Sequence, residues 1–187
     1  MKQTAVTMNT TLNKIKQYFP CSEGWQKLLT FLSKTAADDE LLELTTILES
    51  NGLDDALWAL RAVDGKDREI RLMACDFAES VVHLANDERC NKAIDVSRKY
   101  ANGEATQKEL DAAWAAARDA AMAAAMADDS AAAIAATAAA SAAAFAARAA
   151  ASAAASESWA AWAAKTAGMM GYEEEKQVQI FLKYAKS

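Results

Sequence analysis

The sequence predicts an all-α protein, in which a compact helical bundle is followed by a long alanine-rich antiparallel helical hairpin. The chain has only one proline and six glycines among 187 residues, so the residues that interrupt helices are rare. Apolar residues recur at helical spacing, and no stretch shows the sustained alternation of a half-buried strand. A segment after residue 106 consists mainly of alanine, the residue with the highest helix propensity.

The first third of the chain is expected to form short helices separated by turns. Proline lacks a backbone N–H, and Asn-Gly and Asp-Gly pairs favour the left-handed conformation that ends a helix. The expected helices are 10–19, ended by Pro20; 22–34; 40–50, capped by Asp38 and Asp39 and ended at Asn51-Gly52; and 53–63, ended at Asp64-Gly65.

The next two helices are longer. Helix 67–85 carries apolar residues at helical spacing, which are expected to face the core: Ile70, Ala74, Phe77, Val81 and Leu84. Helix 87–101 follows and ends at Asn102-Gly103. Short helices joined by tight turns are typical of a compact bundle or a stack of helical hairpins.

The composition changes at residue 106, which predicts a domain of residues 1–105 and a second part of residues 106–187. Thr106 and Glu109 have the spacing of a capping box at the start of helix 106–127. A turn at 128–130 is expected to lead into a second helix that reaches about residue 167 and ends at Gly168 and Gly171. The final helix, 172–187, is amphipathic, with an apolar stripe of Val178, Phe181, Leu182 and Tyr184.

An eleven-residue repeat runs through residues 130–162, "SAAAIAATAAASAAAFAARAAASAAASESWAAW". Eleven residues make about three helical turns, so equivalent residues stay almost in register around the axis. The expected rows are Ser130, Ser141 and Ser152; Ile134, Phe145 and Ser156; and Thr137, Arg148 and Trp159. The hairpin would place Arg148 near Glu109 and Phe145 near Ala112.

Three interpretations of this repeat are open. It can serve as a scaffold or interaction arm, or it can be a repeat expansion that is tolerated because it stays helical. A Ser/Thr face on an alanine helix is also similar to short antifreeze peptides. Arg148 and Phe145 interrupt that face, so ice binding is the least favoured interpretation.

The composition excludes several classes of function. A net charge of -6 disfavours non-specific binding to nucleic acid or to anionic lipid. Three cysteines and one histidine without metal-ligand spacing predict neither a disulfide framework nor a zinc site, and no cofactor is expected. The chain start lacks the apolar core of a signal peptide, and charged residues interrupt the alanine tract, so we expect a cytoplasmic protein without a membrane span.

No catalytic site can be assigned from the sequence. His83 lies one turn after Glu79 and Ser80, but a nucleophile and its base on one helix have poor geometry, and no third partner is evident. The candidates are therefore binding residues. Arg61, Arg68 and Arg71 could bind an anion, with Trp58 to stack a base, and Trp159 and Trp162 could anchor a protein partner. The simpler interpretations are that the charged residues form a solvated face and that the final helix folds back over the two tryptophans.

Part of the chain resembles a known family. "DALWALRAV", "REIRLMACDFAESVVHL" and "KAIDVSRKYANGEATQKELDAAWAAARDAA", within about residues 55–125, are similar to immunity proteins of bacteria and bacteriophages, in which an alanine-rich C-terminal extension is typical. This resemblance implies a cytosolic helical protein that binds and neutralises a toxin or, on a phage, a component of host defence. It implies no catalytic residue.

Together these observations predict a non-enzymatic protein that acts by stoichiometric binding, in a bacterial or phage-infected cell. Alanine faces without an intramolecular partner would also favour homo-oligomers. Two alternatives are kept: a small-molecule sponge for a signalling nucleotide, and a structural helical scaffold. An enzyme is least favoured, because no catalytic motif is present.

Overall fold

The computed structural model describes residues 7–126, 131–151 and 174–186. The described residues are mostly helical, which confirms the all-α prediction. They form two compact units: unit 1 contains the residues up to Lys66 and those from Phe181 onward, and unit 2 runs from Asp67 to Ile180. This division differs from the predicted domains 1–105 and 106–187, because the composition change at 106 falls inside unit 2.

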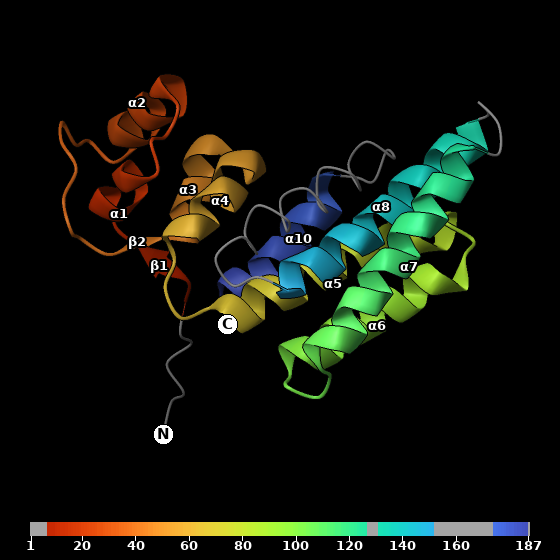
Figure 1. Ribbon diagram of the computed structural model, residues 1–187. Coiled ribbons are helices and arrows are strands. Elements are labelled where there is room, and N and C mark those ends of the chain that lie inside the picture. The colour runs from red at the N-terminus through yellow and green to blue at the C-terminus, as the bar shows by residue number, and fades with distance from the viewer. Residues whose placement is uncertain (1–6, 127–130, 152–173, 187) are drawn as a thin grey trace. The chain divides into compact units, whose positions relative to one another are not determined.

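Unit 1 contains short helices and one small sheet (Figure 1). Its elements are β1 (Asn9–Thr10), α1 (Leu12–Gln17), α2 (Ser22–Phe31), β2 (Leu42–Glu43), α3 (Leu44–Asn51), α4 (Leu53–Ala59) and the 3₁₀ helix η1 (Leu60–Ala62). The strands are antiparallel, with Thr10 opposite Leu42. The predicted helix start at residue 40 is wrong, because Leu42 and Glu43 pair with β1 before α3 begins.

Large apolar side chains fill the core of unit 1. The largest that are fully buried are Met8, Leu12, Leu44, Ile47, Leu57, Leu60 and Phe181. The backbone N–H of Met8 donates to the carbonyl of Ala185 at 2.8 Å. The end of α10 (Glu174–Ala185), the final amphipathic helix that the sequence predicts, is thereby tied to the beginning of the chain.

Unit 2 is built from long helices. They are α5 (Asp67–Val81), the 3₁₀ helix η2 (Val82–Leu84), α6 (Glu88–Ala101), α7 (Gln107–Ala125), α8 (Ala131–Ala151) and the first part of α10. Helix α8 packs against α5, α6 and α7, and α6 packs against α5 and α7. The alanine-rich helix therefore lies among the other helices of its unit.

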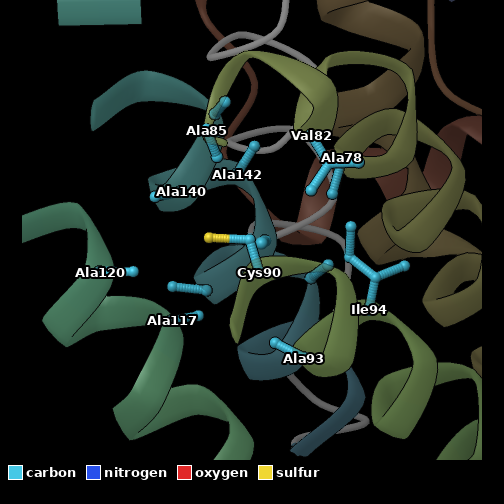
Figure 2. Close-up of a cluster of buried hydrophobic side chains, with 14 of the residues drawn as sticks. Ala78, Val82, Ala85, Cys90, Ala93, Ile94, Ala117, Ala120, Ala140 and Ala142 are labelled. Atoms are coloured by element: carbon cyan, nitrogen blue, oxygen red, sulfur yellow. The ribbon is translucent and has the colours of Figure 1, made fainter. Parts of the chain in front are cut away.

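The helices of unit 2 meet through very small side chains. Figure 2 shows Ala117 and Ala120 of α7 facing Ala140 and Ala142 of α8, with Cys90 of α6 among them. Alanine methyl groups allow helix backbones to approach closely, so dispersion contacts involve the backbones themselves. This alanine-rich cluster contains few large apolar groups and depends on close packing.

The eleven-residue rows lie away from this core where they are described. Thr137, Ser141 and Phe145 are half-buried, and Ile134 is 62% exposed. The hydroxyls of Thr137 and Ser141 each donate a hydrogen bond to the carbonyl four residues earlier in the same helix, at 2.8 Å. Neither hydroxyl therefore needs a partner outside the helix to use its hydrogen. The remaining members of the rows, including the Arg148 side chain, lie outside the described residues.

The predicted helix ends are largely confirmed. The Thr106 hydroxyl accepts the N–H of Glu109, and the Glu109 carboxylate accepts the N–H of Thr106 at 2.7 Å, which completes the capping box. Gly52 and Gly103 adopt φ of 97° and 78°, conformations that glycine reaches without strain. The turn at 128–130 and the helix end at Gly168 lie outside the described residues.

Candidate functional site

A pocket of about 130 Å³ opens within unit 1. Most of its lining is apolar, and two tryptophans, Trp25 and Trp58, contribute to it. The remaining lining residues are Ile15, Pro20, Cys21, Gly24, Leu28, Ile47, Asn51, Asp55 and Ala59, which come from α1, α2, α3, α4 and the turn between α1 and α2. Concave apolar surfaces with a few polar groups are typical of binding sites.

The turn between α1 and α2 forms one edge of this pocket. Phe19 has a φ of 54°, which is rare for a residue with a side chain, and its N–H donates to the Lys16 carbonyl at 3.2 Å. Pro20 follows and cannot continue the helix. Cys21 then caps α2, because its sulfur accepts the N–H of Gly24 at 3.3 Å.

A short hydrogen-bond network fixes the polar side of the pocket. The Asn51 amide donates to the Gly24 carbonyl at 2.8 Å and to the Asp55 carboxylate at 2.6 Å, and the Ser50 hydroxyl donates to Asn51 at 2.7 Å. A Cβ on Gly24 would lie only 2.6 Å from the Asp55 carboxylate, so glycine allows this close approach. The network joins α2 to α3 and α4 beside the pocket.

The predicted nucleotide site is not assembled within either unit. The Arg61 guanidinium lies 4.4 Å from the centre of the Trp58 ring, and its Nε donates to the Trp58 carbonyl at 2.8 Å. The ring that could stack a base is thus already contacted by Arg61. Arg68 and Arg71 belong to unit 2, so the three arginines do not converge within one unit.

In unit 2, both of these arginines contact the end of α6. Arg68 donates to the Asn102 side chain at 2.7 Å, and Arg71 lies 5.9 Å from the Tyr100 ring. The Nε of Arg71 is buried and has no hydrogen-bond partner among the described residues. These contacts connect α5 to the end of α6.

The other predicted candidates give no catalytic arrangement. Trp159 and Trp162 lie outside the described residues. His83 is exposed on η2, and the Ser80 hydroxyl donates to the Phe77 carbonyl at 2.6 Å. No group of three His, Cys, Asp or Glu side chains in the described parts of the chain could hold a metal ion.

The three cysteines differ in environment. Burial raises the pKa of the Cys75 thiol to about 12 and that of the Cys90 thiol to about 11, so both stay protonated and weakly reactive near neutral pH. Cys21 is exposed at the pocket edge. It is therefore a selective point for chemical labelling of the pocket.

Several large apolar side chains are exposed to solvent. In unit 1 they are Tyr18, Phe19, Phe31 and Leu41, and in unit 2 they are Met122, Met126 and Ile134. Phe19 is the most exposed, at 90%, and it directly precedes a residue of the pocket. The sequence interpretation missed it, although an aromatic pair before the only proline, "YFP", was the signal.

No helix within the described residues is long and apolar enough to cross a membrane. Comparisons with protein families, with curated proteins and with solved structures give no match to this chain. The similarity to immunity proteins therefore stays a prediction from the motifs quoted above.

Proposed function

We propose that this chain is a non-enzymatic protein that binds a protein target stoichiometrically, as an immunity protein or a phage counter-defence inhibitor does. The observation that carries the proposal is the apolar pocket of unit 1, which two tryptophans line and an exposed phenylalanine borders. Aromatic residues around a desolvated pocket are typical of the centres of protein interfaces. The motif similarity within residues 55–125 supplies the expected class of target.

The size of the pocket favours a side chain over a nucleotide. A cavity of about 150 Å³ accommodates benzene, whereas pockets for drug-sized ligands have about 300–1,000 Å³. The pocket here, at about 130 Å³, has room for one aromatic or aliphatic side chain. Because Arg61 already contacts Trp58, this site also supports the nucleotide sponge less well than the protein binder.

Unit 2 acts in this proposal as a separate, closely packed helical body and carries no part of the recognition surface. The predicted hairpin register, with Phe145 near Ala112 and Arg148 near Glu109, is retained as part of the proposal. It is supported by Leu110 of α7 and Ala147 of α8, which pack in one buried cluster. A purely structural scaffold, the second alternative, would use the same packing without the pocket.

Self-association through alanine faces has less support than self-association through unit 1. The α8 alanines from Ala142 to Ala144 are buried against the other helices of unit 2. A second copy could reach them only by displacing a helix of the same chain. We therefore assign self-association to a surface of unit 1.

Selective blocking of the pocket tests the proposed function. A bulky maleimide on Cys21 covers the pocket edge, and a Cys21→Ser chain treated identically is the matched control, since the other thiols are buried. We expect the untreated chain and the control to capture the same protein from a bacterial lysate, and the labelled chain to lose it. The purified partner should bind with a stoichiometry near one to one in calorimetry.

A toxicity assay then distinguishes an inhibitor from a simple binder. When the captured partner is expressed in bacteria and slows growth, co-expression of the wild-type chain should restore growth. Cys21→Trp, which places an indole at the pocket edge, should not. Release of a nucleotide on heat extraction, without protein capture, would favour the sponge instead.

A further inference from the structure

We propose that the unit 1 pocket also binds Phe19 of a second copy of this chain, so that two copies form a closed two-fold dimer. The inference rests on the proposed function in one respect: both use the pocket as a socket for a single apolar side chain. The inference names a second copy of this chain as a partner of the pocket, and it does not depend on the identity of any target protein.

The Phe19 ring is exposed, and its backbone conformation is fixed, in the single chain. It is 90% exposed, so it does not occupy the pocket of its own chain. Its backbone is held in the left-handed region between the end of α1 and Pro20. Because this conformation is already fixed, little conformational entropy is lost when the ring is bound.

The position of Phe19 favours a closed dimer over an open chain of subunits. A two-fold interface uses the same patch on both subunits, so an anchor and its socket must lie side by side. Phe19 directly precedes Pro20, which lines the pocket. A two-fold axis through this patch places each Phe19 at the other copy's pocket, and both anchors are used at once.

Charge on this patch is also complementary. Lys16 is exposed in the last turn of α1, three residues before Phe19. Asp54 and Asp55 lie in the first turn of α4, and Asp55 lines the pocket. When Phe19 enters the partner's pocket, Lys16 approaches these carboxylates of the partner, and opposite charges meet in both halves of the dimer.

The expected dimer is weak. One phenylalanine and its surroundings bury less surface than the roughly 800 Å² per partner of a standard stable interface. We therefore expect a Kd on the order of tens of micromolar, which high salt weakens further because the rim contacts are charged.

Sedimentation velocity on the full chain tests this directly, from about 5 to about 500 µM and at low and high salt. The wild type should shift from monomer to dimer with increasing concentration, whereas Phe19→Ser should stay monomeric. Phe31→Ser is the matched control, since Phe31 is also exposed, at 52%, but does not line the pocket. Circular dichroism should show unchanged helicity in both variants.

A pair of chains that has only one Phe19 and only one open pocket supplies an independent readout. A wild-type chain labelled with fluorescein on Cys21 keeps its Phe19 but has a blocked pocket. Its fluorescence anisotropy should rise on titration with Phe19→Ser, which keeps an open pocket, but only at concentrations well above the Kd of the two-fold dimer, because one of the two anchor contacts is missing. It should not rise with Phe19→Ser that is itself blocked at Cys21.

Three results would overturn the inference: a wild type that stays monomeric throughout, a Phe19→Ser variant that dimerises like the wild type, or growth to larger oligomers. Each is obtained without the target protein. Loss of target capture on pocket blocking, measured separately, would still support the proposed function, so the two proposals can fail independently.

Discussion

Replacing a buried alanine by leucine tests whether unit 2 depends on close packing of methyl groups. Ala117 of α7 is 0% exposed and belongs to the same buried cluster as the α8 alanines. Leucine there adds an isobutyl group where helix backbones already lie close together. Overpacking of a well-packed core costs about 1–3 kcal/mol, and the complete burial of Ala117 among other helices favours the upper part of that range.

The matched control is Ala123→Leu on the same helix, where alanine is exposed. Leucine and alanine differ by only about 0.2 kcal/mol in helix propensity, so this change should be nearly neutral. Urea unfolding followed by circular dichroism measures the difference. For a chain of this size, about 2–4 °C of melting temperature corresponds to each kcal/mol, so Ala117→Leu should melt several degrees below the control.

Equal stability of the two variants would refute the reasoning. It would mean that α7 and α8 have room between them for a larger side chain, and that the alanines are not there to permit close approach. A loss of helicity in Ala117→Leu without a loss in the control would have the opposite meaning and would support the packing argument.

Further predictions concern ion pairs, pH and thiols. Arg98→Met should lower the free energy of unfolding by about 2–3 kcal/mol, because Arg98 binds the Asp76 carboxylate at 2.6 Å and the Asp76 side chain is only 12% exposed. In the same urea titration, a matched change of the exposed partner, Glu79→Gln, should lower it much less. Hydrogen bonds from Thr106, above all from its backbone N–H, hold the pKa of Glu109 below its ordinary value of 4.5. Glu109→Gln should therefore lower the free energy of unfolding at neutral pH. The difference from the wild type should vanish as the pH falls below 4.5. A thiol reagent at mild alkaline pH should modify Cys21 rapidly and the two buried cysteines only after unfolding.

The helices of this protein were predictable because their signals are local. The capping box at Thr106, the stop at Asn102-Gly103 and the core face of α5 follow from residues a few positions apart. The start of α3 was not predictable in the same way. Leu42 and Glu43 are good helix formers, and only pairing with Thr10 and Asn9, far away in the sequence, makes them a strand.

The candidate site was predicted only in part. Trp58 was named, and the structure places it in the pocket, but the pocket also needs Trp25, Cys21 and Ile47, which tertiary packing brings together. Helix α7 and the residue that caps it carry a stripe of large side chains every four positions, and this stripe shows why exposure is hard to predict: Leu110, Trp114, Arg118, Met122 and Met126. Residues every four positions drift by about 40° per step around a helix, so the stripe begins at buried Leu110 and ends at Met126, which is 83% exposed.

The near-uniform face of α8 has an evolutionary consequence. Gaining or losing one block of eleven residues would lengthen or shorten this rod by about 16 Å and rotate the rest of the helix by only about 20°. The inward methyl groups would still meet their neighbours, and any overhang would be a stretch of alanine that extends a helix already nucleated. Slippage during DNA replication could therefore adjust the length of this protein in whole steps while its fold is retained.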